Sequence, residues 1–398
     1  MGVAPTDTSY DVVIVGGAMI GASVAWHLAT RGDFDGSILV VERDPAFEFA
    51  STSHTNSCMR QQFSTEINIR ISQYCAEFIR QFRDLIGSPD APDIHVHPFG
   101  YLYLAGNDAQ AAHLRVAQEL QAELGVDTRI LSPEELARRW PFLTLDDIVL
   151  GSFNGRDEGY FDGATMFDWW RRMARHAGVE TLHDEVQAVT TSAGAVSGVT
   201  LNGGAQIGCG VLVNAAGPRA AQVAAMAGLS LPVEPRKRYT YVIDAQAPLD
   251  RDLPLTVDPS GIHMRTDGSR YMIGAAPEDD GPVDPDDFAF DHGLWERRVW
   301  PTIAARIPAF EAVRVVNEWV GHYAYNRLDQ NAIVGTHPQL SGMIFANGFS
   351  GHGFQQAPAV GRGVAELICA GRYETLDLSD LGVERILTGR GLRESAII

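Results

Sequence analysis

Three small residues near the start of the chain are spaced so that a phosphate group could approach the backbone. Gly16, Ala18 and Gly21 occupy the small positions of a G-x-G/A-x-x-G pattern in VVIVGGAMIGASVAWHLA. In this pattern the first residue allows a tight turn, the second admits a pyrophosphate, and the third lets helix and strand pack closely. The N–H groups of the helix that follows, including those of Met19 and Ile20, would then face the negative charge.

An acidic residue follows at the separation that suits a ribose contact. Glu42 ends the apolar run 37–41, and its carboxylate would accept hydrogen bonds from a ribose hydroxyl, with Arg43 beside it at the same site. The carboxylate would repel the 2′-phosphate of NADP, whereas NAD and FAD both fit this motif. A tight turn without a ligand is the weaker alternative, because strand, turn, helix, strand and glutamate occur together.

The residues around this motif predict the start of a βαβ unit. Apolar runs at 10–15 and 37–41 indicate strands, and a helix is expected from 20 to 30. Further helices are expected at 66–86, 109–125, 164–177, 291–306 and 357–370, and from 132, where SPEEL carries a capping-box pattern. Further strands are expected at 95–104, 185–190, 196–201, 207–213, 238–244, 261–266, 270–274, 313–320, 331–335 and 343–346.

Alternating helices and strands near both ends predict an α/β domain assembled from separate pieces. We expect residues 1–90, 151–235 and 316–398 to form this Rossmann-like domain, and 91–150 and 236–315 to form a second, strand-rich domain. A chain of 398 residues is also longer than one core usually serves.

Composition narrows the class of protein. The chain has 50 acidic and 31 basic residues, a net charge of −19, which disfavours nucleic acid as a partner. No run of 18 apolar residues predicts a membrane span, and the first nine residues lack a signal-peptide pattern, so we expect a cytoplasmic enzyme. The four cysteines lack CxxC spacing, and no metal-ligand pattern accompanies them. Lys237 is the only lysine.

Three further segments carry a family resemblance. They are ASTSHTNSCMRQQFS at 50–64, VLVNAAGPRAAQVA at 211–224 and GMIFANGFSGHGFQQAPAVGRGVAELI at 342–368. With the first motif, they resemble the D-amino-acid oxidase superfamily, in particular the branch of glycine oxidase, sarcosine oxidase, dimethylglycine dehydrogenase and the FAD-dependent oxidoreductase-domain proteins. The resemblance implies an FAD-binding domain of the glutathione-reductase type and a β-sheet substrate domain. It also implies hydride removal from the carbon–nitrogen bond of a small amine or amino acid, giving an imine that hydrolyses.

The resemblance also implies which residues hold FAD. Hydroxyls and N–H groups at 51–54 would serve the pyrophosphate or the ribityl chain, Val186 would pass the adenine, and small residues at 216–217 would allow close approach. The glycine-rich turn before the last long helix would aim N–H groups at the flavin carbonyl, although an ordinary turn into a helix is the alternative. The residues so assigned are Ser51, Thr52, Ser53, His54, Val186, Ala216, Gly217, Gly348, Ser350, Gly351, His352, Gly353 and Phe354.

Substrate contacts are predicted less directly. In sarcosine oxidases a lysine that helps to bind the carboxylate stands where this chain has Gln355, and in glycine oxidases an arginine stands where it has Tyr323. Arg60 is our first candidate for a carboxylate anchor, with Arg265 and Tyr323 as others; alternatively, Arg60 ties the flavin loop to the protein. His263 matches a tyrosine that contacts substrate in relatives, and a position on a strand rim is the alternative.

His352 is expected near the flavin ring, where it either contacts the substrate or holds the turn. Two other histidines match positions of covalent flavin attachment in relatives: His54 and His322. We expect a non-covalent cofactor nonetheless. The strand 270–274 lacks the lysine that promotes reaction with oxygen in sarcosine oxidases. We therefore expect the reduced enzyme to react slowly with oxygen, or to pass its electrons to another acceptor.

Other functions stay open at this point. The same scaffold oxidises hydroxy acids or polyol phosphates in some relatives. A non-catalytic assembly protein that keeps FAD for stability is another possibility, and an NAD-linked dehydrogenase is a fourth. The sequence does not name the substrate.

Overall fold

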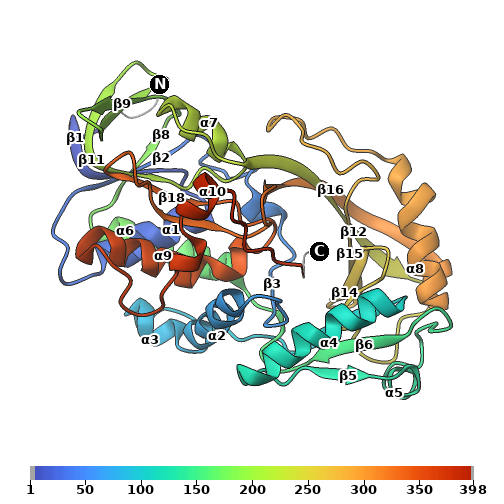
Figure 1. Cartoon of the computed structure of the whole chain (residues 1–398). Helices are drawn as coiled ribbons and strands as arrows, with labels where there is room; N and C mark the ends of the chain where they lie inside the picture. Colours follow the sequence, from blue (N-terminus) through green and yellow to red (C-terminus); the bar gives the residue numbers. More distant parts are fainter. Residues whose placement is uncertain (1–4, 396–398) are drawn as a thin grey trace.

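Two eight-stranded sheets form the frame of the molecule (Figure 1). A computed structural model describes residues 5–395. The first sheet has the order β17-β18-β11-β1-β2-β8, and β10 and β9 extend it from β11. Its strands are β1 (Ser9–Val15), β2 (Ile38–Glu42), β8 (Glu180–His183), β9 (Val186–Ser192), β10 (Ala195–Leu201), β11 (Gln206–Asn214), β17 (Ile333–Thr336) and β18 (Met343–Asn347).

The central strand of this sheet is β1, which runs parallel to both β2 and β11. Its side chains alternate between two cores, as a strand buried on both faces requires. Val12 and Ile14 pack with helices α1 (Met19–Ala29), α6 (Gly163–His176) and α9 (Gly353–Ala370). Val13 and Val15 pack with β9, β10 and α7 (Ala220–Met226) on the opposite face. The carboxyl end of β1 is thereby held rigidly where the glycine motif begins.

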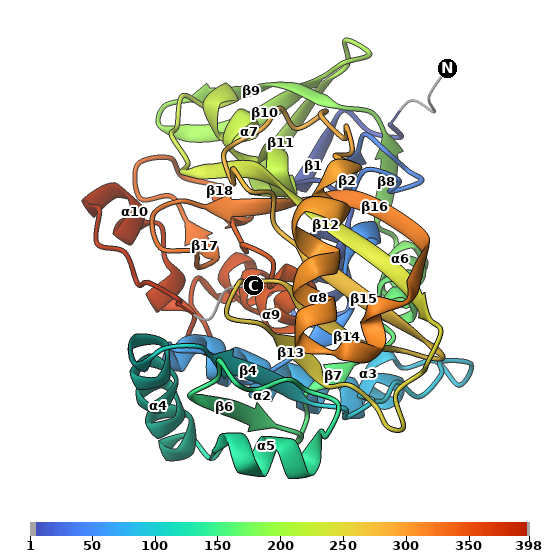
Figure 2. The ribbon, with the colours of Figure 1, turned by 90° about the vertical axis from the view of Figure 1, so that its right-hand side faces the viewer.

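The second sheet has the order β16-β12-β15-β14-β13-β4-β6-β5. Helix α8 (Trp300–Arg306) and the π-helical turn η3 (Trp295–Val299) cover its outer face, where Tyr239, Tyr241 and Ile243 are buried (Figure 2). Its strands are β4 (Tyr101–Ala105), β5 (Arg129–Leu131), β6 (Leu150–Asn154), β12 (Val233–Ala245), β13 (Leu255–Val257), β14 (His263–Asp267), β15 (Arg270–Ala275) and β16 (Val313–Asn326).

Shorter elements complete the described chain. A two-stranded ribbon of β3 (Cys58–Met59) and β7 (Gly159–Tyr160) lies between the two sheets in sequence and space. The remaining helices are α2 (Glu66–Arg80), α3 (Phe82–Ile86), α4 (Asp108–Glu123), α5 (Pro133–Arg139) and α10 (Glu384–Thr388). Short 3-10 turns are η1 (Ser51–His54), η2 (Gly217–Arg219), η4 (Pro308–Glu311) and η5 (Ser379–Leu381).

Several predicted elements differ in the structure. The helix expected at 66–86 is two helices with a break at Gln81, and the strand expected at 95–104 is limited to β4, because 95–99 makes only an isolated bridge at His97. The helix expected at 291–306 begins at Trp295 as a π-helical turn. The helix expected at 357–370 begins earlier, at Gly353, directly after the glycine-rich turn. The capping box at Ser132 is confirmed.

The division into two domains remains a prediction, and the sheets show where its borders would fall. β6, β12 and β16 all belong to the second sheet, and each crosses one of the expected borders at 150/151, 235/236 and 315/316. Both sheets are mixed, since each contains parallel and antiparallel pairs. Among residues 5–395, no helix combines the length and the apolar character that crossing a membrane requires.

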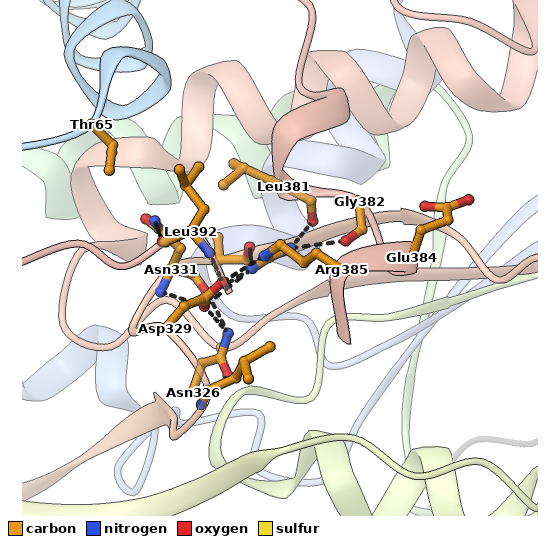
Figure 3. Close-up of polar contacts among 12 residues, drawn as sticks. Thr65, Asn326, Asp329, Asn331, Leu381, Gly382, Glu384, Arg385 and Leu392 are labelled. Atoms are coloured by element: carbon orange, nitrogen blue, oxygen red, sulfur yellow. Dashed lines mark hydrogen bonds and ion pairs between the residues drawn. The ribbon is translucent and has the colours of Figure 1, made fainter. Parts of the chain in front are cut away.

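A buried ion pair fixes the last part of the described chain to the loop after β16 (Figure 3). Arg385 Nε donates to Asp329 Oδ2 at 2.7 Å, and the exposed fractions of the two side chains are 8% and 0%. Asp329 also accepts hydrogen bonds from Asn326 Nδ2 and from the N–H of Leu392. Two residues later, the buried Glu394 accepts hydrogen bonds from Ser64, Thr65 and Asn68. The C-terminal segment is therefore built into the core beside residues 60–65.

Candidate active site

A large cavity, of about 640 Å³, extends from the carboxyl end of β1 to the second sheet. One end is lined by the glycine motif, by Glu42 and by residues 183–186. The other end is lined by β12, β14 and β16 and by the turn that begins α9. The lining thus includes residues from both sheets, which suits a dinucleotide better than a compact ligand.

Glycine is required at two positions of the first motif. Gly16 has φ +96°, and a Cβ there would lie 2.5 Å from the carbonyl oxygen of Ala215. A Cβ at Gly21 would overlap the carbonyl oxygen of Gly16. The turn and the first turn of α1 therefore pack backbone against backbone. The N-cap residue of α1, Ala18, supplies no side-chain cap, the first turn holds no acidic residue, and its residues line the cavity, so the partial positive charge of the helix lies beside the cavity.

Glu42 lies at the end of β2, beside this turn. Its two carboxylate oxygens accept hydrogen bonds from the N–H groups of Gly17 and Asp44, each at 2.7 Å. Burial raises the pKa of Glu42. Thr52 Oγ1 accepts a hydrogen bond from the N–H of Met19, and Ser51 Oγ donates to the carbonyl of His322. These bonds join η1 to both the first helix and the second sheet.

The turn before α9 combines three residues with positive φ: Gly348 (+68°), Ser350 (+49°) and Gly351 (+98°). Ser350 is not a glycine, and it is held there because its N–H donates to Ala324 O and its Oγ accepts from the N–H of Asn326. A Cβ at Gly351 would lie 2.5 Å from the ring of Tyr323. The turn is thus pressed against β16, and the N-terminus of α9 borders the cavity.

Arg60 is fully buried in the loop between β3 and α2. Its guanidinium donates to the carbonyl of Gln62, lies 2.8 Å from Nε2 of His352 and stacks over Phe63 at 3.9 Å. The amide of Gln355 binds the backbone of Arg60, with Oε1 accepting from its N–H at 3.0 Å. These contacts agree with the interpretation that Arg60 ties the loop to the turn before α9, although Arg60 also lines the cavity.

The inner face of the second sheet closes the other end. Arg238 on β12 stacks over the ring of Tyr323 at 4.6 Å, and both line the cavity. His263 on β14 leans over Gly274, where any side chain would collide with its ring. His263 Nε2 lies 2.9 Å from Asn56 Nδ2. Burial and the neighbouring arginines lower the pKa of His263 to about 4, so this histidine is neutral at physiological pH.

The family is decided by comparison with known proteins. A family model described as "FAD dependent oxidoreductase" matches residues 11–367. The "FAD-dependent oxidoreductase domain-containing protein 1" of Xenopus laevis is 36% identical over 425 aligned positions, covering 98% of this chain and 85% of the relative. The chain belongs to this family of FAD-dependent oxidoreductases.

Solved structures agree with this assignment. L-proline dehydrogenase from P. horikoshii is 27% identical with a TM-score of 0.83, covering 96% of this chain and 98% of that one. Glycine oxidase from Geobacillus kaustophilus shares the fold, with a TM-score of 0.80 at 21% identity over 94% of this chain and 98% of that one. The predicted fold class and the predicted cofactor are confirmed.

The chain's own residues fit FAD. Gly16 and Gly21 keep the turn packed at the N-terminus of α1, which would hold a pyrophosphate, and Glu42, which also lines the cavity, would bind the ribose. Val186 lines the far end of the cavity, where adenine would lie, and the turn at 348–353 lies where the flavin would end. Any role of a single residue toward FAD remains a proposal.

Most of the residues predicted to contact cofactor or substrate line one cavity. They are Gly16, Ala18, Met19, Ile20, Glu42, Arg43, Ser51, Thr52, His54, Arg60, Val186, Ala216, Gly217, His263, Tyr323, Ser350, Gly351, His352, Gly353, Phe354 and Gln355. Gly21, Ser53 and Gly348 do not line it: Gly21 supports the turn, and the hydroxyl of Ser53 donates to the carbonyl of Phe47. Arg265, on β14, also lies outside the lining and binds Asp267.

A segment that the sequence motifs do not single out contributes Pro285 and Asp286 to the cavity lining. We call residues 276–292 the strap; it runs from β15 to η3. Asp286 of the strap binds Arg219 and lies 3.6 Å from Arg43, and Asp287 binds Lys237 at 2.8 Å. The acidic run EDDGPVDPDD was a visible signal, but acidic runs are usually solvated surface.

The two candidate histidines for covalent attachment lie beneath the strap. His322 stacks on Phe288 of the strap with ring centroids 4.3 Å apart, and its Nε2 lies 2.9 Å from the carbonyl of Asp287. His54 packs against Gly321 on the neighbouring side and lies 6.2 Å from Phe288, ring to ring. Whether FAD is attached covalently stays a prediction, and both rings border the cavity.

Proposed function

We propose that this protein removes a hydride from the carbon–nitrogen bond of a small amine or amino acid. The observation that carries the proposal is the composition of the cavity wall beside the turn at 348–353. It presents two guanidinium groups, Arg60 and Arg238, two neutral histidines, His263 and His352, and Tyr323, on whose ring Arg238 stacks. No carboxylate from the second sheet lines this end among the residues that the structure describes.

This wall suits amine oxidation for a physical reason. FAD, when bound, accepts two electrons and a hydrogen as hydride from the carbon next to nitrogen, leaving an imine that water hydrolyses to a carbonyl compound and an amine. The amine must be neutral for this step. Burial in this cavity and the nearby guanidinium of Arg60 lower the pKa of a bound ammonium and so favour the neutral form, whereas the charge of Arg238 is offset by its ion pair with Asp280. The residues therefore act by orientation and electrostatics and do not need a general base.

The names of related proteins support the same reaction class. Sarcosine dehydrogenase of Mus musculus is 23% identical over 93% of this chain, which spans 41% of that protein. 4-Methylaminobutanoate oxidase of Paenarthrobacter nicotinovorans is 24% identical over 96% of this chain and 46% of that protein. All of these names, like that of L-proline dehydrogenase, describe oxidation beside a nitrogen.

An anaerobic screen tests the proposal. The holoenzyme is mixed without oxygen with N-methyl, N-carboxymethyl, cyclic and D-amino acids, and flavin absorbance near 450 nm is followed. We expect at least one amine to bleach the flavin within seconds at millimolar concentration. Bleaching by a hydroxy acid or a polyol phosphate, with no amine active, would contradict the proposal.

We also propose that the natural acceptor is not oxygen. Lys237, the only lysine, lies outside the cavity lining, and its Nζ binds Asp287 and the carbonyl of Ala289. No ammonium is therefore available beside the flavin to promote reaction with oxygen. After anaerobic reduction, exposure to air should reoxidise the protein more slowly than an added quinone or dye. Immediate peroxide formation on mixing with air would refute this.

A further inference from the structure

A buried carboxylate that the proposed reaction does not use is hydrogen-bonded to the segment that carries Arg60. Glu158 stands in the loop between β6 and β7, and its exposed fraction is 0%. One carboxylate oxygen accepts hydrogen bonds from the N–H groups of Gln61 and Gln62 at 2.6 and 3.0 Å. The other oxygen accepts one from Nε2 of Gln62 at 2.9 Å. Three bonds therefore join this carboxylate to the two residues that follow Arg60.

The backbone on both sides of Glu158 is held in unusual conformations. Asp157 has φ +56° although it is not a glycine, and Gly159 has φ +146°. A Cβ at Gly159 would overlap the carbonyl oxygen of His97, and the carboxylate of Asp157 pairs with Arg80. Strained conformations of this kind persist where the surrounding structure determines them, and they are common at functional sites. The turn thus directs the side chain of Glu158 into the protein.

Gln62 connects Glu158 to the cavity. Its carbonyl accepts a hydrogen bond from the guanidinium of Arg60, and its Nε2 donates to the carbonyl of Tyr101 at 3.0 Å as well as to Glu158. Arg60 and Tyr101 both line the cavity. Nη2 of Arg60 lies 2.8 Å from Nε2 of His352, in the turn before α9. A change at Glu158 can therefore reach this turn through Gln62 and Arg60.

Glu158 can also change its charge near neutral pH. Burial raises its pKa to about 7, although its hydrogen bonds and the charge of Arg60 act in the opposite direction. Burial also raises the pKa values of Tyr101 and Tyr103 on β4, the other titratable groups that face Glu158, so both keep their protons in this range. His352, which Arg60 contacts, has a pKa well below its ordinary value and stays neutral.

We propose that Glu158 is a positioning residue for the flavin: its carboxylate holds Gln62, and thereby Arg60, against the turn before α9, and its proton sets how strongly the charge of Arg60 acts on FAD. An ionised Glu158 offsets part of the guanidinium charge, and a protonated Glu158 does not. Because reduced flavin carries more negative charge than oxidised flavin, the protonated state favours reduction. This inference concerns the cofactor and does not depend on which substrate is oxidised.

The first test uses only the wild-type holoenzyme. The visible spectrum of the oxidised flavin is recorded from pH 5.5 to 8.5, and we expect a change that follows one proton with a midpoint near 7. His54 and His322 also border the cavity, but burial lowers their pKa values, so their titration would fall at lower pH. A spectrum that stays constant over this range, or changes only below pH 6, would overturn the proposal.

The second test repeats this titration with two variants. Glu158→Gln keeps the shape and an acceptor oxygen but has no proton to lose, so the spectral change near pH 7 should vanish. Asp157→Asn is the matched control, since it makes the same change one residue earlier, outside the cavity lining, and asparagine tolerates positive φ. This control should keep the change. Its persistence in Glu158→Gln would assign the proton to another group and overturn the proposal.

The third test measures how readily the flavin is reduced. Each protein is equilibrated without oxygen with a reference dye, and the ratio of reduced to oxidised flavin is determined. At pH 8.5 this ratio should be at least about threefold higher in Glu158→Gln than in wild type, whereas at pH 5.5 the two should agree within about 1.5-fold. Asp157→Asn should match wild type at both pH values.

A merely structural Glu158 predicts a different result. Its replacement would lower the melting temperature but leave no pH-dependent gap between the two flavin ratios. Equal ratios in Glu158→Gln and wild type at pH 8.5 would therefore refute the role assigned to its charge. If Glu158→Gln does not retain flavin, the spectral titration of the wild-type holoenzyme decides.

Discussion

Removal of the buried guanidinium of Arg385 should destabilise the protein and loosen its flavin turn. In Arg385→Met the carboxylate of Asp329 stays fully buried and loses its charged partner. Four carbonyl groups, those of Asn331, Ala332, Leu381 and Gly382, also lose a donor. The methionine side chain has similar length, so the effect reports the lost charge and hydrogen bonds more than lost volume.

The size of the effect follows from the burial of the pair. Breaking a buried ion pair by removing one partner costs about 3–5 kcal/mol. Unfolding entropy is about 2.1 cal/mol/K per residue, which gives about 0.8 kcal/mol/K for 398 residues. Dividing the two, we expect the melting temperature to fall by about 4–6 °C. The flavin should also dissociate more readily, because Asn326 joins Asp329 to Ser350 in the turn.

The assay is thermal unfolding followed by circular dichroism, with released flavin followed by fluorescence in the same scan. Arg372→Met is the matched control, because the ion pair that Arg372 forms with Glu374 at 3.5 Å is exposed to solvent. Such a pair contributes at most about 1 kcal/mol, which predicts a change of no more than about 1 °C. If Arg385→Met melts within about 1 °C of that control, the buried pair does not stabilise the fold as we reason.

Three other perturbations have defined outcomes. Gly21→Ala forces a Cβ onto the carbonyl of Gly16 and should yield protein without FAD. The control is Gly32→Ala, which should keep its flavin because a Cβ at this position meets nothing within 4 Å. Equal flavin content in the two variants would contradict the packing argument. Burial raises the pKa of Glu158 to about 7 in the folded state, whereas a glutamate in the unfolded chain has a pKa of about 4.3. The folded state therefore binds this proton more tightly than the unfolded state does. The resulting stabilisation is fully present below about pH 4 and is lost as pH rises through 7. Melting temperature should therefore fall more between pH 5 and pH 8 in wild type than in Glu158→Gln, and parallel profiles would refute the assignment. Asp286→Asn removes the ion pairs that the strap makes with Arg219 and Arg43 and should speed FAD dissociation by about 2–5-fold at low salt, with the difference shrinking at high salt. Asp279→Asn, at an exposed neighbour in the strap, should not change the rate.

The parts of the fold that sequence predicts well are those in which a local rule decides the structure. The first βαβ unit is predicted within a residue or two, because the buried strand, the glycine turn and the helix each have their own signal. Strands β6 and β13 were not predicted because apolar and polar residues do not alternate along them. All five residues of β6, LGSFN, are buried. The helical periodicity of the sequence continues through Gln81, yet the helix breaks at this residue, because tertiary packing decides the break.

The cofactor half of the site was predictable for the same reason, since its residues stand in ordered motifs. The substrate half was not. Arg238 lies in the run PRKRY, where alternation along a strand places Arg236 and Arg238 on one face and Lys237 on the other. That pattern was visible, but only the sheet shows which face meets the cavity. Asn56 also lines the cavity but carried no signal, because its contact with His263 joins positions 207 apart in the sequence.

The bonds that Glu394 makes set an order for biosynthesis. The loop with Arg60 leaves the ribosome early, yet Ser64, Thr65 and Asn68 obtain their acceptor only when residue 394 has been made. The strands β1, β11 and β18 are likewise neighbours in space but are translated far apart in time. A nascent chain can therefore form its first glycine turn long before the cavity is complete, because the turn at 348–353 that lines the same cavity is translated much later.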